Sequence, residues 1–371
     1  MKKVLIFSLA YYPHVGGAEV AIKELTDRIK DVEFHIVTLL FSRQDAWHER
    51  LGNIQIHRVG FGGAYVSKIL FVPLAALAAR TLHRREMFDA AWVMMSYMLL
   101  PLTLARLNVP YVLTLQEGDT YGHMFRRLRV LPFLPLLNAG FRHATVVQVI
   151  SNYLGGWVRK RGCTGPIEVI PNGVDIQKFS GKKVSHVGVV LIHTGRLVHK
   201  NALDIVVRTL AFVPPDISLR LVGDGPEQVS LKLLAENLGV AGRVEFLPYV
   251  EHNKLSTLLH AADIFIRPSR SEGMGNSFVE AMAAGLPVIA TQEGGIADFL
   301  FDAKRNPDKP STGWAVDKDN PEQIAAAVKD ILSNPEQVSL VIKNAQELVI
   351  AKYDWDLIAR QMREKVFARV L

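Results

Sequence analysis

A glycine-rich segment in the C-terminal half of the chain carries two glutamates eight positions apart. Glu272 stands in the loop, and Glu280 lies one turn inside the helix that is predicted to follow. The loop between them contains Gly273, Met274, Gly275 and Asn276. Carboxylates accept hydrogen bonds from hydroxyl groups, and the free backbone N–H groups at a helix start bind phosphate. A sugar joined to a diphosphate needs this mixture, so the segment is a candidate site for such a ligand.

Two other interpretations compete for this segment. The Gly-Met-Gly stretch at 273–275 resembles the start of a dinucleotide-binding fingerprint, but Phe278 occupies the third glycine position, so this interpretation fails. The stretch from Ser277 to Glu280 also fits a capping box, in which Glu280 would bond back to the helix start and have only a structural role. The spacing alone does not decide between capping and ligand binding.

Loops that directly follow other predicted strands hold a second set of candidates. Gly195, Arg196 and Lys200 follow one such strand. Arginine offers a fork of donors to phosphate oxygens and lysine offers a point charge, so this pair suits a diphosphate. Gly16 and Gly17 follow the first predicted strand and would let the backbone approach a ligand closely. The structural alternatives are two solvated surface cations and an ordinary tight turn.

The composition excludes several classes of protein and site. The single cysteine excludes an internal disulfide framework and a multi-cysteine metal site, and it fits a reducing compartment. The Asp-x-Asp triplets at 317–319 and 354–356 look like exposed loops, so no metal site is expected. The longest apolar stretch, 69–79, is interrupted by Pro73 and is shorter than the roughly 20 residues of a spanning helix. We therefore expect a cytoplasmic protein that is soluble or lies on a membrane surface.

Short apolar runs alternate with helical patterns along the whole chain, which has 371 residues. Continuous apolar strands between helices indicate parallel sheets that are covered on both faces. A chain of this length suggests two domains. We predict an α/β fold with two doubly wound, Rossmann-like domains over residues 1–180 and 186–352, joined by a turn-rich stretch at 175–185. Ligands in such sheets bind at the carboxyl ends of the strands, where the candidate residues stand.

The net charge of +7 is distributed unevenly. Residues 1–180 hold 21 Lys and Arg against 13 Asp and Glu, whereas the remainder holds 22 against 23. Two stretches of the basic half, 68–85 and 124–134, mix cations with large apolar residues. Such a mixture suits a helix lying in an anionic membrane interface. The alternative is two ordinary helices with buried apolar faces and solvated basic faces; no recognition motif supports a nucleic-acid partner.

The candidate motifs, taken in order, resemble those of the retaining glycosyltransferase family 4. The resemblance covers nearly the whole chain and rests on five motifs, namely Gly16-Gly17, Asn172–Asp175, Gly195–Lys200, Gly223–Pro226 and Glu272–Glu280. It implies a GT-B fold, in which two Rossmann-like domains enclose an interdomain cleft. It also implies that the last helix, within 353–371, packs back on the N-terminal domain. The N-terminal domain would bind the acceptor and the C-terminal domain the donor.

The resemblance also implies roles for individual residues of the donor site. Arg196 and Lys200 match the pair that holds the donor diphosphate, and Glu272 matches the glutamate that contacts the donor sugar. Glu280 matches the glutamate that contacts the ribose. The remaining donor-site positions are Gly16, Gly17, Gly195, Val250, Gly273, Met274, Gly275 and Asn276. No cofactor or metal is implied, because the donor, a UDP- or GDP-sugar, is itself a substrate and the cations can stabilise the departing diphosphate.

Two positions depart from the family pattern. Gln116 stands where the family commonly has a histidine near the reacting sugar, and Asn201 stands where glycine is common. Glutamine can hydrogen-bond a hydroxyl but is no acid or base near pH 7. The leading hypothesis is therefore a hexosyltransferase that acts on a glycan or lipid-linked acceptor. A catalytically degenerate nucleotide-sugar-binding protein is the alternative that Gln116 suggests, and a nicotinamide-dependent dehydrogenase lacks its glycine fingerprint.

Overall fold

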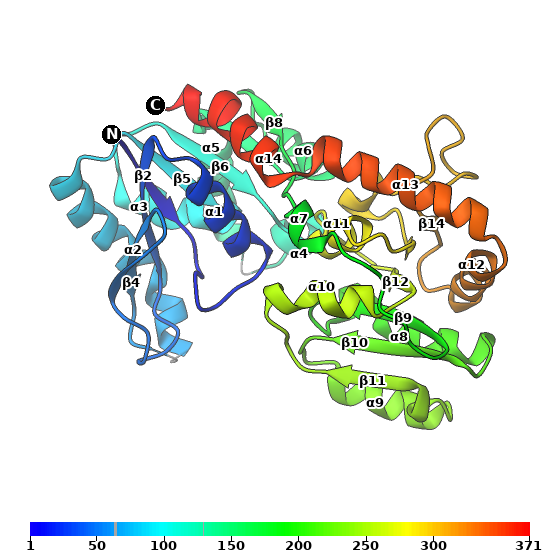
Figure 1. The fold of residues 1–371 in the computed structure, drawn as a ribbon. Helices are drawn as coiled ribbons and strands as arrows, with labels where there is room; N and C mark the ends of the chain where they lie inside the picture. Colours follow the sequence, from blue (N-terminus) through cyan, green and yellow to red (C-terminus); the bar gives the residue numbers. More distant parts are fainter. Residues whose placement is uncertain (63–64, 129) are drawn as a thin grey trace. The chain divides into compact units, whose positions relative to one another are not determined.

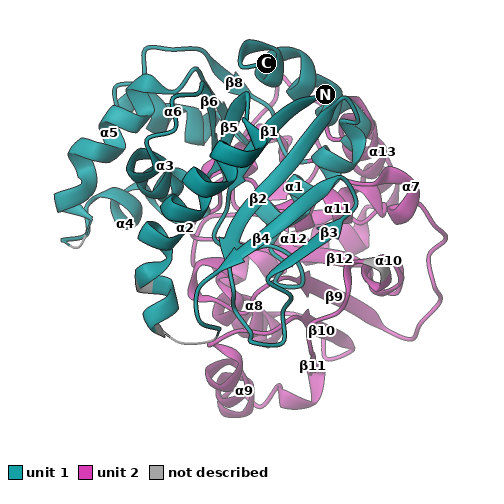
Figure 2. Ribbon diagram, turned by 90° about the vertical axis from the view of Figure 1, so that its left-hand side faces the viewer, with its two compact units in different colours: residues 1–172, 355–371 teal, residues 173–354 magenta. Residues whose placement is uncertain are grey.

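The computed structural model describes residues 1–62, 65–128 and 130–371. The chain forms two compact units (Figure 2): unit 1 comprises residues 1–172 and 355–371, and unit 2 comprises residues 173–354. The division at 172/173 precedes the turn-rich stretch at which we expected the boundary. The short helix α7 (Ile176–Phe179) therefore belongs to unit 2.

Unit 1 contains an eight-stranded sheet with the order β3-β4-β2-β1-β5-β6-β7-β8. The strands are β1 (Lys2–Phe7), β2 (Val32–Leu39), β3 (His48–Leu51), β4 (Ile54–Val59), β5 (Ala90–Met94), β6 (Tyr111–Leu115), β7 (Val146–Val149) and β8 (Ile167–Val169). Neighbouring strands are parallel, except that β3 pairs antiparallel with β4. The edge strand β3 was not predicted, because its sequence, HERL, is polar and its residues are largely exposed.

Helices cover the sheet of unit 1 (Figure 1). They are α1 (Gly17–Arg28), α2 (Tyr65–Glu86), α3 (Leu99–Ala105), α4 (Tyr121–Phe125), α5 (Leu134–His143), α6 (Asn152–Lys160) and α14 (Trp355–Gln361). Along β1, residues Val4, Leu5, Ile6 and Phe7 are all fully buried, although successive side chains point to opposite faces. Both faces of the sheet are therefore covered, as the continuous apolar runs predicted.

The end of the chain returns to unit 1. After α14 it continues as a π-helical turn (Met362–Val366) and a 3₁₀ turn (Phe367–Arg369). Trp355 and Phe367 join the apolar core, where the Phe367 ring lies 5.2 Å from Trp92 and 5.9 Å from Phe34. Arg28 of α1 donates to Asp356 at 2.6 Å. The last 17 residues thus complete the core on the α1 face of the sheet.

Unit 2 contains a six-stranded parallel sheet with the order β11-β10-β9-β12-β13-β14. The strands are β9 (Val189–Thr194), β10 (Ile217–Val222), β11 (Val244–Leu247), β12 (Ile264–Arg267), β13 (Val288–Ala290) and β14 (Trp314–Ala315). The helices besides α7 are α8 (Leu203–Thr209), α9 (Gln228–Asn237), α10 (His252–His260), α11 (Asn276–Ala283), α12 (Pro321–Ser333) and α13 (Pro335–Lys352). The prediction of two α/β units built on parallel sheets is confirmed.

The two basic, apolar stretches of unit 1 fold differently from each other. Residues 68–85 belong to α2, whose Phe71, Ala75 and Ala79 are buried while Leu77 is 58% exposed. Residues 124–134 do not form one helix: α4 ends at Phe125, and the next helical segments begin only at 131. The expectation of a continuous interfacial helix is therefore wrong for this second stretch. Among the described residues, no helix combines the length and the apolar character that crossing a membrane requires.

Candidate functional site

The predicted donor-site loops of unit 2 meet at the carboxyl ends of the strands. The loop after β12 contacts the loop after β9, since the Arg270 N–H donates to the Lys200 carbonyl at 2.7 Å. The loop after β10 also contacts the loop after β9, since the Leu197 N–H donates to the Asp224 carbonyl at 3.0 Å. At Gly225 a Cβ atom would lie 2.1 Å from the Leu197 carbonyl oxygen, so only glycine permits this approach. The fold thus brings together motifs whose contacting residues, Lys200 and Arg270, are 70 positions apart in the sequence.

Glu272 is buried in an ion pair, with 6% of its surface exposed. Its Oε2 accepts a hydrogen bond from the Arg267 guanidinium, and its Oε1 accepts from the N–H of Gly273 at 3.1 Å. The backbone around it is equally crowded, because a Cβ at Gly294 would lie 1.9 Å from the Glu272 carbonyl oxygen. Although Glu272 stands in a loop, as predicted, it is part of the packed interior of unit 2.

Arg267, which the sequence analysis did not assign to the site, organises it. Besides Glu272, the guanidinium donates to Ser277 Oγ at 2.7 Å and to Asn201 Oδ1 at 2.8 Å. Asn201 in turn donates to the Arg196 carbonyl at 2.6 Å. One side chain therefore joins Glu272 to the start of α11 and to the loop of Arg196. An arginine that ends an otherwise apolar strand was the signal in the sequence that could have identified it.

His193 lies next to Arg267 and is completely buried. Burial, and secondarily the positive charge of Arg267, lowers the pKa of His193 well below its ordinary value. The imidazole is therefore neutral at physiological pH. A proton would add a second positive charge beside the Arg267 guanidinium, so this position disfavours the protonated imidazole.

Glu280 lies on α11 and forms a hydrogen bond with His252, which in turn is bonded by Lys178. Its Oε1 accepts from His252 Nε2 at 2.9 Å, and Lys178 Nζ donates to His252 Nδ1 at 2.9 Å. The N-cap of α11 is Gly275, which has no side chain to cap the helix, and Ser277 Oγ accepts from Arg267 instead. The capping-box interpretation of Glu280 is therefore wrong.

The predicted diphosphate-binding pair lies at the rim of the same site. Arg196 is exposed and Lys200 is half-buried in the 3₁₀ turn His199–Asn201. Within the described residues, neither side chain forms an ion pair. Both positive charges are therefore available to an anionic ligand.

The other predicted site residues of the C-terminal half lie near Glu272, after β11 and after β9. Gly275 adopts a left-handed conformation, with φ of 85°, and α11 begins at the next residue, Asn276. Met274 is buried, whereas Val250 is half-buried just before α10. Gly195 also has a positive φ, 134°, directly after β9. All these predicted residues of the C-terminal half belong to unit 2.

Three predicted residues belong instead to unit 1. Gly16 is the N-cap of α1, and its N–H donates to Glu19 Oε2 at 2.7 Å. Gly17 is the first residue of that helix. Gln116 follows β6 and exchanges two hydrogen bonds with the Asn172 side chain, at 3.1 and 3.0 Å. This reciprocal amide pair fixes the orientation of Gln116.

The next residue, Glu117, is a buried carboxyl group that the sequence analysis did not assign a role. Its Oε1 accepts from the backbone N–H of Ser96 at 2.7 Å. Burial raises the pKa of Glu117 above its ordinary value. Glu117 therefore ties the loop after β6 to the loop after β5, next to Gln116. In the part of the chain that the structure describes, no group of three His, Cys, Asp or Glu residues is placed to hold a metal ion.

Comparison with known proteins identifies the family of the chain. Residues 176–348 match the family model "Glycosyl transferases group 1", and residues 15–178 match "Glycosyltransferase Family 4". An uncharacterized glycosyltransferase of Methanocaldococcus jannaschii is 25% identical over 98% of this chain and 97% of that protein. A GDP-mannose-dependent phosphatidylinositol monomannoside mannosyltransferase of Mycolicibacterium smegmatis is 27% identical over 68% and 70%.

A solved structure shares the fold. The complex of HepE from Anabaena with UDP-glucose superimposes with a TM-score of 0.79 at 21% identity, over 99% of this chain and 100% of that one. The two family models together match residues 15–348, and the solved structure matches 99% of the chain. The chain therefore belongs to the family 4 type of glycosyltransferases and has the GT-B fold.

Proposed function

We propose that the protein transfers a hexose, with retention of its anomeric configuration, from a nucleotide-diphosphate sugar to a glycan or lipid-linked acceptor. The observation that carries this proposal is the joint placement of Glu272, Arg267 and Lys200 at the carboxyl ends of the strands of unit 2. A carboxylate fixed by a guanidinium, next to unpaired cations, suits a ligand that has both hydroxyl groups and phosphates.

The diphosphate, the sugar and the ribose of the donor each have a proposed partner in unit 2. Arg196 and Lys200 would hold the diphosphate, and Glu272 would accept hydrogen bonds from the sugar hydroxyls. Glu280, whose carboxylate His252 orients, would accept them from the ribose. The M. smegmatis relative is GDP-mannose-dependent and HepE binds UDP-glucose, and these two relatives support a GDP- or UDP-sugar as the proposed donor. The family resemblance implies that Gly16 and Gly17, which belong to unit 1, would also contact the diphosphate.

The proposed reaction needs neither a metal nor a cofactor from the protein. The bond between the sugar C1 and the diphosphate oxygen breaks, and the electron pair leaves with the diphosphate. The acceptor oxygen bonds to C1 on the same face, and its proton passes to the leaving phosphate. Arg196 and Lys200 would stabilise the negative charge that develops there. Gln116 would orient a hydroxyl group, because an amide bonds hydroxyls without exchanging protons.

A panel of UDP- and GDP-sugars, scored by nucleotide release and product formation, tests this function. We expect one donor to be turned over, with the anomeric configuration retained in the product. Glu272→Gln should abolish transfer, and Lys200→Met should weaken nucleotide binding at least tenfold. Glu236→Gln and Lys329→Met, on exposed positions of α9 and α12, are the matched controls.

The same panel separates the degenerate nucleotide-sugar-binding protein from the enzyme. An enzyme should keep measurable activity in Gln116→His and lose most of it in Gln116→Ala. Nucleotide binding without turnover of any donor, combined with turnover by Gln116→His, would establish the degenerate alternative.

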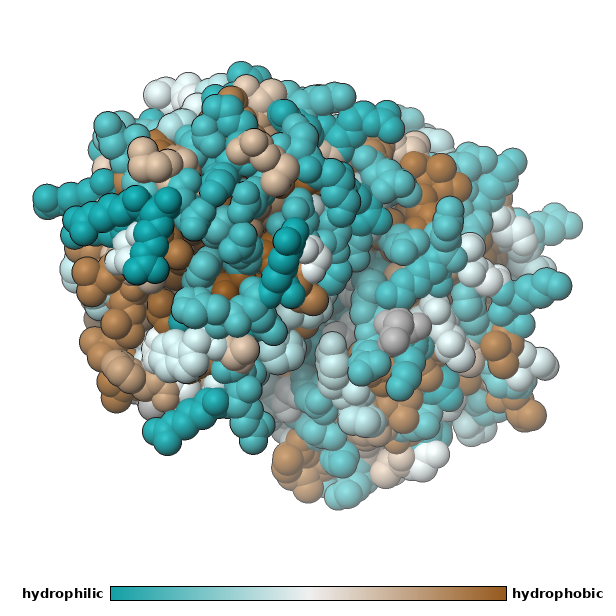
Figure 3. Space-filling view, turned by 60° about the vertical axis from the view of Figure 1, so that its left-hand side comes forward, coloured by the Kyte–Doolittle hydropathy of each residue, from teal (hydrophilic) through white to brown (hydrophobic). Residues whose placement is uncertain are grey.

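We also propose that the protein associates peripherally with an anionic membrane surface, on the cytoplasmic face. Exposed cations and apolar side chains occur together on unit 1, including Arg126 and Leu128, of which 85% is exposed. Figure 3 shows apolar side chains gathered on the left of the view, among hydrophilic ones. Arg129 belongs to the same basic stretch but lies outside the described residues.

A further inference from the structure

Unit 1 contains a pocket of about 350 Å³ beside the ends of β5 and β6. Ser96 and Tyr97, which follow β5, form part of its wall, and so does Asp119, which follows β6. The carboxyl ends of strands are where open α/β sheets bind ligands. The volume is at the lower end of the range for small-molecule sites, enough for part of a larger ligand.

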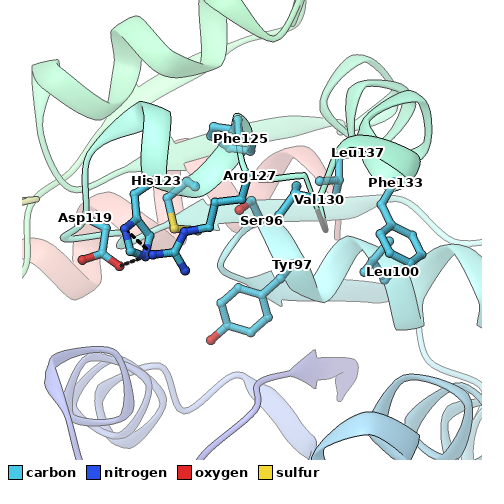
Figure 4. A pocket seen from close by; sticks show the side chains of 11 residues that line it. Ser96, Tyr97, Leu100, Asp119, His123, Phe125, Arg127, Val130, Phe133 and Leu137 are labelled. Carbon is cyan, nitrogen blue, oxygen red and sulfur yellow. Dashed lines mark hydrogen bonds and ion pairs between the residues drawn. The ribbon is translucent and has the colours of Figure 1, made fainter.

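One end of the pocket is apolar. Figure 4 shows Leu100 of α3, Leu137 of α5 and Phe133 on one side of the pocket, and Phe125 and Val130 complete the apolar wall. Leu137 and Phe125 are buried, whereas 48% of Phe133 is exposed, so this end opens to the surface. Three exposed leucines lie close to Phe133 in the sequence: Leu131 in the same 3₁₀ turn, Leu128 before it and Leu136 in α5. Apolar surface therefore continues from inside the pocket to the outside of unit 1.

The other end of the pocket is polar and nearly balanced in charge. The Arg127 guanidinium donates to His123 Nδ1 at 2.7 Å, and His123 Nε2 lies 3.8 Å from Asp119 Oδ2 (Figure 4). This end therefore presents N–H donors from Arg127 and acceptor oxygens from Asp119. Hydroxyl groups both donate and accept hydrogen bonds, so a sugar satisfies both kinds of partner. A simple anion would satisfy Arg127 but would be repelled by Asp119.

We infer that this pocket binds the junction of a glycolipid: the sugar lies at the Asp119–His123–Arg127 end, and the first part of the hydrocarbon chain lies between Leu100, Phe133 and Leu137. The inference rests on the proposed function, for which it narrows the acceptor to a sugar that is linked to a lipid. The chain would leave the pocket past Phe133, where the exposed leucines meet the membrane. The occupant is a glycolipid rather than an anionic phospholipid, because the polar end carries a carboxylate.

Alkyl glucosides provide the direct test on the full-length protein. Binding of octyl, decyl and dodecyl β-D-glucoside is measured by calorimetry below their micelle-forming concentrations, with free glucose and dodecyl phosphate for comparison. We expect affinity to rise with chain length, by up to about fourfold for each buried methylene. Free glucose should bind far more weakly than dodecyl glucoside, and so should dodecyl phosphate. Equal affinity for the phosphate and the glucoside would overturn the assignment of a sugar head.

Variants locate the binding in this pocket. Leu100→Trp and Val130→Trp, both at half-buried positions, should fill the apolar end and reduce dodecyl glucoside affinity at least tenfold. Leu77→Trp, on an exposed position of α2, is the control. Arg127→Gln should weaken binding, whereas Arg126→Gln, the same change at the adjacent exposed position, should not. If both tryptophan variants of the pocket fold and still bind dodecyl glucoside like the wild type, the inference is overturned.

Nucleotide affinity distinguishes failure of this inference from failure of the proposed function. UDP and GDP titrations report on the proposed donor site, which includes none of the residues that line the pocket. Normal nucleotide binding without glucoside binding would reject only the glycolipid pocket. Absence of both UDP and GDP binding, with none of the donors turned over, would reject the proposed function itself.

Discussion

At the scale of single residues, the buried ion pair of Arg267 and Glu272 changes what a mutation is expected to do. A loop position suggests that Glu272→Ala would leave the fold intact. The structure instead predicts a loss of stability, because the substitution leaves the Arg267 charge buried without its partner. Removing one member of a buried ion pair lowers the free energy of unfolding by about 3–5 kcal/mol, whereas replacing both members with apolar residues lowers it much less.

A double-mutant cycle in urea measures this coupling. We expect Glu272→Leu and Arg267→Met to lower the free energy of unfolding by about 3 kcal/mol each. The double variant should lose clearly less than the sum of the two. Additive losses would mean that the two charges do not stabilise each other. The exposed pair of Arg220 and Glu245, whose nitrogen and oxygen lie 2.7 Å apart, is the control and should couple by under about 1 kcal/mol.

The second prediction at this scale concerns His252 as a positioning residue for Glu280. Because Lys178 donates to Nδ1, the Nε2 atom of His252 donates to the Glu280 carboxylate. His252→Ala should weaken nucleotide binding about tenfold, since a hydrogen bond to a charged group contributes roughly 1.5–3 kcal/mol. His252→Gln keeps a donor and should restore part of the affinity. His260→Gln, on the same helix, should bind nucleotide like the wild type; equal loss in all three variants would show a general structural effect.

At the scale of elements, three histidines connect the strands at one edge of the unit 1 sheet. His35 of β2 lies 3.1 Å from His57 of β4, which lies 3.2 Å from His48 of β3. Burial, and then the neighbouring His35 and His48, lowers the pKa of His57 from 6.5 to about 4. The folded protein therefore resists protonation that the unfolded chain accepts.

Because the folded protein resists the protonation of His57 and the unfolded chain does not, we expect acid to destabilise the folded protein through this edge of the unit 1 sheet. Above pH 6.5 neither state protonates His57, so its contribution to stability is fully present there. Between pH 6.5 and about 4 the unfolded state takes up a proton that the folded state does not, and stability falls with falling pH. His57→Asn should reduce the dependence of the free energy of unfolding on pH in this window. An unchanged slope would show that His57 is not the group responsible; His143→Asn, at an exposed site, is the control.

At the scale of the whole molecule, the uneven charge predicts how the protein meets a membrane. Each cation near an anionic surface contributes about 1 kcal/mol to the free energy of membrane binding, and exposed apolar side chains contribute further. We expect co-sedimentation with vesicles that contain anionic lipid, weakening at high salt. Arg126→Glu combined with Leu128→Ser should reduce binding at least tenfold. The control, Lys182→Glu combined with Val187→Ser, likewise replaces a cation with a carboxylate and an apolar residue with serine, at exposed positions of unit 2, and should not reduce binding.

Binding that is equal for neutral and anionic vesicles would contradict the electrostatic part of this prediction. Loss of binding in both double variants would show that the effect of charge is not confined to unit 1. If the wild type never binds anionic vesicles, even at low salt, the proposal of peripheral membrane association is wrong, and a soluble glycan or a small molecule is then favoured as the acceptor.

The sequence by itself determined the α/β class, the two parallel sheets and the family. Buried strands such as β1, β6 and β9 are continuous apolar runs, and the glycines and charged residues that follow them are local signals. The family resemblance depended on the order of these signals along the chain. It did not require knowledge of any contact.

Only the tertiary structure decided what the charged side chains contact. The pairing of Arg267 with Glu272 depends on how the loop after β12 folds back, and the pairing of His252 with Glu280 joins two helices across 28 positions. The polar strand β3 forms because β4 offers a free edge, although its own sequence has no apolar pattern. Periodicity and turn signals are local, whereas these contacts depend on packing between distant segments. For that reason the sequence predicted which loops after the strands contain the candidate site residues. The fold alone determined which side chains these residues contact.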